Sequence, residues 1–168
     1  MPPTLFIISG LPASGKSTLA KLIAKKYSAF YLRIDTIEQG LRDLCSFDVH
    51  GEGYRLSYRI ATDNLKIGHN VVADSCNPIN LTRKEWQDVA KANNSIFINI
   101  EIICSDKAEH RKRIESRISE IEGLKLPNWN DVENREYHQW ETDRIMIDTA
   151  GKTAEMCIEE LVSGICLK

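Results

Sequence analysis

One short segment near the start of the chain, Gly10–Ser17 (GLPASGKS), has the spacing of a phosphate-binding loop, G-x-x-x-x-G-K-[ST]. Leu5–Ile8 before it is apolar and β-prone, and Thr18–Ala24 after it has helical spacing, so the context is strand, loop, helix. In that arrangement backbone N–H groups and the positive end of the helix surround phosphate oxygens. Lys16 would reach the β- and γ-phosphates, and the Ser17 hydroxyl would ligate Mg²⁺. The segment therefore predicts binding of a nucleoside triphosphate, with an ordinary glycine-rich turn as the alternative.

Two carboxylates follow later apolar runs. Asp35 comes after Phe30–Ile34, and Asp74 comes after Asn70–Ala73. Phosphoryl transfer uses one carboxylate near the metal and another that orients the acceptor hydroxyl, so both aspartates are candidates. Each could instead cap the helix that follows it, because Asp is favoured at that position. Asp35-Thr36-Ile37-Glu38 even has the spacing of a capping box.

Positive charge for the transferred group could come from a later charged segment. Arg113 and Arg117 are four residues apart and would share one face of a helix. A solvated, salt-bridged helix is the alternative, because glutamates are interspersed there. Gly123–Asn130 follows with the length and composition of a mobile flap, and Arg135 lies beyond it. Arginines on such a lid would complete the site when substrate binds.

These residues need a sheet whose strands end at one edge. Apolar runs predict strands at about 4–9, 30–34, 70–73, 96–103 and 145–147. Helices are expected at about 16–27, 36–45, 54–67, 80–92, 106–122, 131–141 and 153–162, with Gly123 placed to end the helix over 106–122. This alternation predicts an α/β sandwich with a mainly parallel sheet that binds ligands at the carboxyl ends of its strands. Without repeats or linkers, residues 1–168 are expected to form one domain, with a lid at about 118–140.

The composition bounds the class of protein. Hydrophobic residues make up 42% of the 168-residue chain and charged residues 27%, which is typical of a soluble globular domain. The net charge of −2 argues against a nucleic acid or an anionic membrane as the main partner, although a local basic groove would change that. The five cysteines form no C-x-x-C and lie mostly in apolar runs, so we expect reduced core thiols in a cytoplasmic protein. No apolar run has the length of a signal peptide or a membrane span.

Taken together, these motifs resemble the P-loop kinase superfamily. The resemblance is carried by Gly10–Ser17, Asp35, Asp74-Ser75-Cys76-Asn77 and Arg113-Ile114-Glu115-Ser116-Arg117. It is greatest with chloramphenicol phosphotransferase, the zeta-type toxin kinases and the polynucleotide 5′-kinases. It implies a three-layer α/β/α sandwich with a five-stranded parallel sheet in adenylate-kinase-like order and a small helical lid. It also implies ATP and Mg²⁺ as cofactors.

The same resemblance implies a role for each candidate residue. Asp35 would be the base or orienting carboxylate for the acceptor, with Lys16 and Arg117 as the other catalytic residues. Asp74 would hold the water shell of Mg²⁺ beside Ser17. Arg113 would pack against adenine. The expected nucleotide-binding residues are Gly10, Leu11, Pro12, Ala13, Ser14, Gly15, Lys16, Ser17, Thr18, Arg113, Arg117, Thr149 and Gly151. The expected substrate-binding residues are Asp35, Glu38, Asn77 and Arg135.

Two departures from related kinases bear on the acceptor. Adenylate kinases carry a phosphate-binding arginine after the third strand, where this chain has Asp74–Pro78, so a nucleoside monophosphate is disfavoured. Several relatives have an arginine where this chain has Glu38, and a pocket with Asp35 and Glu38 would suit a neutral or cationic alcohol. Glu38 as a capping carboxylate is the alternative.

The function expected from the sequence is ATP-dependent transfer of a phosphoryl group to a hydroxyl of a small molecule, by a monomer or homodimer. Two alternatives stay open. One is a kinase for a nucleotide or nucleic-acid 5′-hydroxyl, which a basic acceptor groove would favour. The other is a nucleotide-binding regulatory protein, for which side chains should block the acceptor crevice.

Overall fold

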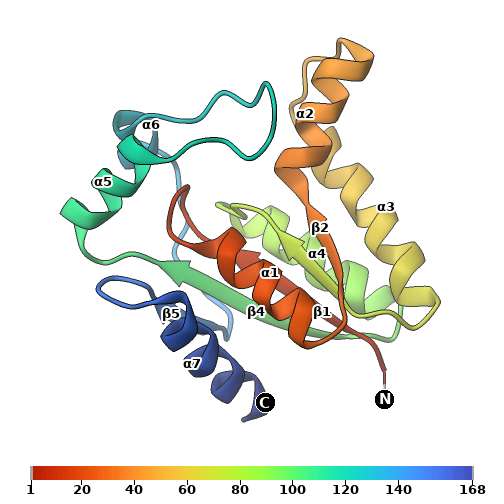
Figure 1. Ribbon diagram of the computed structural model, residues 1–168. Coiled ribbons are helices and arrows are strands. Elements are labelled where there is room, and N and C mark those ends of the chain that lie inside the picture. The colour runs from red at the N-terminus through yellow and green to blue at the C-terminus, as the bar shows by residue number, and fades with distance from the viewer. Residues whose placement is uncertain (1, 168) are drawn as a thin grey trace.

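The computed structural model describes residues 2–167 and consists of strands and helices in near alternation (Figure 1). The strands are β1 (Thr4–Ser9), β2 (Phe30–Arg33), β3 (Val71–Asp74), β4 (Ile96–Ile103) and β5 (Ile145–Asp148). The helices are α1 (Lys16–Lys26), α2 (Ile34–Cys45), α3 (Glu52–Lys66), α4 (Asn80–Ala92), α5 (Lys107–Ser116), α6 (Trp129–Glu133) and α7 (Ala154–Cys166). No helix among the described residues has both the length and the apolar character needed to cross a membrane.

The strands form a single five-stranded sheet in the order β2-β3-β1-β4-β5, and every neighbouring pair is parallel. β1 lies in the centre, where Ile8 is paired with Asp74 of β3 and with Ile100 of β4. Because all strands run the same way, the segments that follow β1, β2 and β3 leave the sheet at one edge. The topology therefore gathers Gly10–Ser17, Asp35 and Asp74 at that edge.

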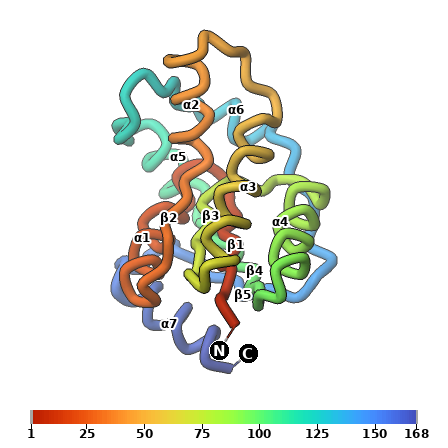
Figure 2. Tube along the Cα trace, turned by 90° about the vertical axis from the view of Figure 1, so that its right-hand side faces the viewer, coloured from red at the N-terminus to blue at the C-terminus, as the bar shows by residue number. Residues whose placement is uncertain are grey.

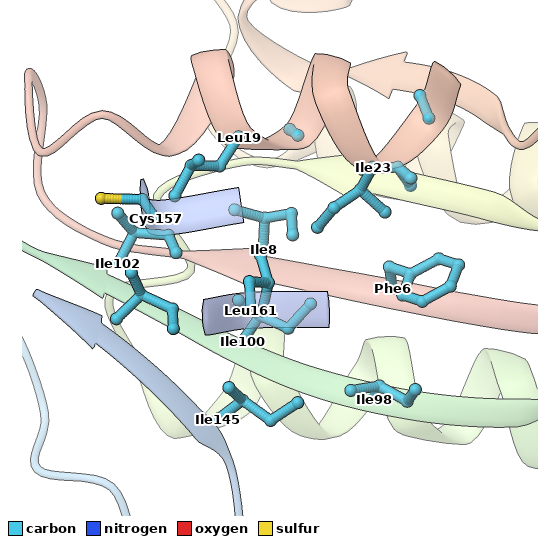
Figure 3. Close-up of a cluster of buried hydrophobic side chains, with 14 residues drawn as sticks. Phe6, Ile8, Leu19, Ile23, Ile98, Ile100, Ile102, Ile145, Cys157 and Leu161 are labelled. Atoms are coloured by element: carbon cyan, nitrogen blue, oxygen red, sulfur yellow. The ribbon is translucent and has the colours of Figure 1, made fainter. Parts of the chain in front are cut away.

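Helices cover both faces of the sheet, which makes three layers. Figure 2 shows α1 and α7 on one side of the strands and α4 on the other. Residues of β1 alternate between the two faces, as the period of two requires. Phe6 and Ile8 pack with Leu19 and Ile23 of α1 and with Leu161 of α7 (Figure 3).

The opposite face is closed by α3 and α4. Leu5 and Ile7 of β1 pack there with Leu65 of α3 and with Trp86 and Ala90 of α4. All of these side chains are at most 2% exposed, so β1 is buried on both faces. The three-layer α/β/α sandwich with a five-stranded parallel sheet is thus confirmed.

Two expected helices are shorter than their sequence pattern indicates. The charged helix expected over 106–122 ends at Ser116, and Gly123 does not terminate it. Arg117 is already extended, with φ −72° and ψ 143°, so it does not continue the helical face of Arg113. The helix expected over 131–141 is only the single turn α6. Residues 117–128 instead form a long connection that extends toward α2 (Figure 1).

The expectation of core thiols is correct for one cysteine only. Cys157 is buried between α7 and the sheet, whereas Cys45 and Cys166 are exposed. All five are free, so no disulfide contributes to the fold.

Candidate active site

The turn between β1 and α1 has a shape that requires glycine at two positions. Gly10 has φ +147° and Gly15 has φ +97°, values that other residues rarely adopt. A Cβ on Gly10 would lie 2.3 Å from the carbonyl oxygen of Ile102 on β4. A Cβ on Gly15 would lie 3.3 Å from Cγ2 of Thr149. The two glycines of the motif are therefore needed for the close approach of this loop to β4 and to the segment after β5.

Carbonyl groups of the loop are bound by side chains from distant parts of the chain. The Thr149 hydroxyl donates to the carbonyl oxygen of Ser14 at 2.9 Å, and Arg113 donates to the Thr149 carbonyl at 3.0 Å. Nε2 of the buried His110 lies 2.7 Å from the carbonyl oxygen of Pro12. These contacts fix the backbone, while the first N–H groups of α1 have no carbonyl partner within the helix. The loop thus has the geometry of an anion site.

Lys16 is the first residue of α1 and is only 7% exposed. Its side chain lines two adjoining cavities at the carboxyl edge of the sheet. Within residues 2–167, no carboxylate forms an ion pair with it. A buried ammonium without a counter-ion strongly attracts an anionic ligand, because little water screens its charge.

Asp35 lies in the first turn of α2 and does not cap it. The N-cap residue is Arg33, which makes no capping hydrogen bond through its side chain. The capping box considered for Asp35 and Glu38 is therefore absent. Asp35 instead lines both cavities. Burial lowers the pKa of the Arg117 guanidinium, and the nearby Asp35 carboxylate partly offsets this effect.

Asp74 is the last residue of β3, six residues before α4, so it does not cap that helix either. It is 2% exposed. Its Oδ2 accepts a hydrogen bond of 2.7 Å from the Tyr31 hydroxyl, whereas its buried Oδ1 has no partner among the described residues. Burial and the neighbouring carboxylate raise the pKa of the Tyr31 phenol, which therefore stays protonated and donates. One carboxylate oxygen is thus oriented by Tyr31 and the other is left for a ligand.

This arrangement fits a magnesium ion held mainly through water and phosphate. The unpaired Oδ1 of Asp74 is a buried acceptor, and Ser17 supplies a hydroxyl at the adjacent start of α1. No group of three or more His, Cys, Asp or Glu side chains capable of holding a metal occurs within residues 2–167. Mg²⁺ typically keeps several waters and takes only one or two protein ligands beside substrate phosphates, which matches so sparse a set.

Two cavities meet at the carboxyl edge of the sheet. The first, of about 470 Å³, lies beside α1 and α7 and includes Ser17, Thr18, Arg113, Thr149 and Lys152 in its wall. The second, of about 840 Å³, lies between α2, α3 and the 117–128 connection. Among residues 2–167, three line both of them: Lys16, Asp35 and Arg117.

The first cavity brings together most of the expected nucleotide-binding residues. Besides those named above, Ala13 and Gly15 line it. Gly151 does not line this cavity, and its N–H donates to the Glu109 carboxylate. Gly10, Leu11 and Ser14 line neither cavity, and Pro12 lines the second.

The second cavity brings together three of the four expected substrate-binding residues. Asp35, Glu38 and Arg135 line it. Asn77 does not: it is 0% exposed, and its amide donates to the Ile8 carbonyl at 2.8 Å. A residue that follows a buried strand can turn inward as well as outward, and Asn77 turns inward.

Several residues of the site have no recognisable signal in the sequence. Tyr31, which orients Asp74, and His110, which binds the loop, lie in unremarkable strand and helix patterns. The second cavity also contains Arg42, Tyr54, Arg55 and Lys125, which belong to no motif. Only the packing of α2, α3 and the 117–128 connection brings them together.

A family profile described as an AAA domain matches residues 5–127, which is most of the chain. The chain belongs to this AAA domain family. Its fold is that of the P-loop kinases, so the resemblance in the motifs is confirmed.

Two solved structures share the fold of this AAA domain protein. A protein of Chloroflexus aurantiacus proposed to be a kinase has a TM-score of 0.73 at 20% identity, with 99% of this chain and 97% of that chain covered. The APS kinase of Mycobacterium tuberculosis in complex with AMPPNP and APS has a TM-score of 0.68 at 17% identity, with 98% of each chain covered.

Among proteins of known function, an L-seryl-tRNA(Sec) kinase of Methanococcus maripaludis is 28% identical over 164 residues. The match covers 88% of this chain and 60% of that kinase, so the chain spans somewhat less than two thirds of its relative's length.

Proposed function

We propose that this protein is a kinase that transfers the γ-phosphoryl group of ATP to a hydroxyl of a small molecule. The observation that carries the proposal is the pair of adjoining cavities with Lys16, Asp35 and Arg117 at their shared boundary. A kinase must bind donor and acceptor on opposite sides of the transferred group, with positive charge and one carboxylate between them. The family membership and the kinases among the relatives support the same activity.

In this mechanism the P-loop N–H groups and Lys16 bind the phosphates in the first cavity. Asp35 accepts the proton of the acceptor hydroxyl while the oxygen of that hydroxyl forms a bond to the γ-phosphorus. The bond from that phosphorus to the β–γ bridging oxygen breaks, and ADP is the leaving group. Arg117 and Lys16 stabilise the charge on the transferred group. Ser17 and Asp74 would hold Mg²⁺, which neutralises phosphate charge when bound.

We further propose that residues 118–140 act as a lid. In the structure, residues 118–120 of this segment line the first cavity, and residues 123–127 and Arg135 line the second. Glu120 pairs with Lys21 at 2.6 Å and with Arg33 at 3.0 Å. The Glu120 side chain is 61% exposed in both pairs, so water weakens them and the segment can open. Trp129 packs edge-on against His110, so its fluorescence should change when ATP and Mg²⁺ bind. Equal hydrogen exchange across 118–140 with and without nucleotide would argue against a lid.

The decisive experiment is ATP consumption against a panel of alcohols that includes sugars, antibiotics, nucleosides and 5′-hydroxyl oligonucleotides. An acceptor should yield ADP and a phosphorylated product in equal amounts, and Lys16→Ala should abolish both. If no alcohol of the panel is phosphorylated while the protein binds ATP, the regulatory alternative would gain support. The open second cavity of about 840 Å³ favours the kinase, because a regulatory protein has no use for an acceptor crevice.

A hydroxyl carried by RNA is a second candidate acceptor. The observations that favour it are the relative named as an L-seryl-tRNA(Sec) kinase and the basic side chains that line the second cavity. Including aminoacylated tRNA in the panel would distinguish this acceptor from small alcohols.

A further inference from the structure

The second cavity is basic in a protein that is acidic overall. The chain has a net charge of −2, yet this cavity is lined by six Lys and Arg side chains and three carboxylates. Two of the six, Lys16 and Arg117, lie at the boundary with the first cavity, where the proposed mechanism assigns them to the transferred phosphoryl group. The remaining basic residues are Arg42, Arg55, Lys125 and Arg135.

The carboxylates of this cavity already have partners. Glu38 forms an ion pair with Arg42 at 3.5 Å, one helical turn along α2. Glu85 accepts a hydrogen bond of 2.9 Å from the Tyr58 hydroxyl. Asp35 lies beside the guanidinium of Arg117. Two of the three carboxylates therefore have an arginine nearby, and the third has a hydrogen-bond donor.

Three of the basic residues have no such compensation. Arg55 of α3, Lys125 of the 117–128 connection and Arg135 after α6 form no ion pair within residues 2–167. The hydrogen-bond contact of Arg135 is a weak one, to the sulfur of Cys76 at 3.8 Å. Each cation belongs to a different segment, so their convergence on one cavity is not the regular spacing of a solvated helix face.

We infer that the acceptor alcohol carries a phosphate or carboxylate group, which Arg55, Lys125 and Arg135 hold while its hydroxyl faces Asp35. The inference rests on the proposed kinase function and specifies its substrate class. It replaces the expectation of a neutral or cationic alcohol, because Arg42 offsets the charge of Glu38 and the unpaired cations of the cavity outnumber its remaining carboxylates. Arginine is well suited to this task, since its planar donors match the oxygens of carboxylate and phosphate.

The test is a calorimetric titration of the protein whose first cavity is filled with a non-hydrolysable ATP analogue and Mg²⁺. Inorganic phosphate and acetate are the anionic probes, and a 5′-phosphorylated RNA oligonucleotide is a third titrant. The variant is Arg55→Gln combined with Arg135→Gln. The matched control is Arg59→Gln, an exposed arginine one turn along α3 that lines neither cavity.

We expect phosphate or acetate to bind the filled protein and the double variant to bind it at least about tenfold more weakly, because charge-assisted hydrogen bonds are lost. The control variant should bind it as the wild type does. Equal binding by the wild type and the double variant, or no binding of either small anion, would overturn the inference. Binding of the oligonucleotide alone would assign these cations to RNA and overturn it too. The titration does not measure ATP consumption. The proposed kinase function is therefore tested independently, by the assay against the panel of alcohols.

Discussion

Asp35 has two candidate roles that substitution separates. It lies in the first turn of α2 without a capping bond, so its only helical contribution is the interaction with the helix dipole, about 0.3–1 kcal/mol. For a chain of this size about 1 kcal/mol corresponds to roughly 2–4 °C in melting temperature. Asp35→Ala should therefore lower the melting temperature by no more than about 4 °C.

The effect on phosphoryl transfer should be far larger. A positioned general base contributes about 10²–10⁴-fold to rate, so Asp35→Asn, which keeps the shape of the side chain, should slow transfer at least about 100-fold. The affinity for ATP should change little, because the phosphates are bound by the P-loop. The assay is single-turnover transfer to an acceptor found in the panel, beside thermal melting followed by circular dichroism. Asp63→Asn, an exposed carboxylate on α3, is the control. A rate for Asp35→Asn within about threefold of the wild type would refute the assignment, whatever its stability.

The other predictions concern four side chains of the site. Lys16→Ala should leave melting nearly unchanged and lower transfer by orders of magnitude, since its charge stabilises the transition state; near-normal turnover would exclude this role. Arg117→Ala should lower kcat more than it weakens ATP binding, measured by fluorescence titration; the reverse pattern would make Arg117 a ground-state binding residue. Tyr31→Phe should weaken the response of ATP binding to Mg²⁺, because the carboxylate it orients loses its hydrogen bond; an unchanged Mg²⁺ titration would contradict this. Burial raises the pKa of the Glu38 carboxyl in the folded state above its value in the unfolded chain. The folded state therefore loses stability as the pH rises from the unfolded pKa through the folded pKa, because the buried carboxyl must ionise. Glu38→Gln should therefore raise the melting temperature near neutral pH. It should have no such effect below pH about 4.3, the ordinary glutamate pKa, and melting curves of variant and wild type at both pH values test this.

The central features of the fold could be predicted from the sequence because they depend on local apolar runs. The β1 and β4 strands have the predicted bounds, 4–9 and 96–103, since each contains five consecutive buried residues. The P-loop was predictable because the spacing of its glycines, lysine and serine can be read within eight consecutive residues, although Gly10 and Gly15 pack against Ile102 and Thr149.

What could not be predicted depends on contacts between distant segments. The charged pattern after Ser116 is typical of a helix, yet the chain turns extended there and Glu120 pairs with Lys21 and Arg33. The segment after α6 stays irregular because Arg83 of α4 donates to the carbonyls of His138 and Gln139. A charged side chain that binds backbone carbonyls so far along the chain leaves no periodic trace in the sequence.

The hydrogen bond between Thr149 and Ser14 joins residues 135 positions apart, and this has a consequence for the newly made protein. A ribosome that has released the first 130 residues has already exposed the whole of Gly10–Ser17. The chain then lacks Thr149, whose hydroxyl holds the Ser14 carbonyl and whose methyl group lies against Gly15. Arg113 likewise has no Thr149 carbonyl to bind. The loop thus acquires these contacts only after β5 has emerged, so we expect a nascent chain to complete the proposed nucleotide site after nearly all of its sheet has been synthesised.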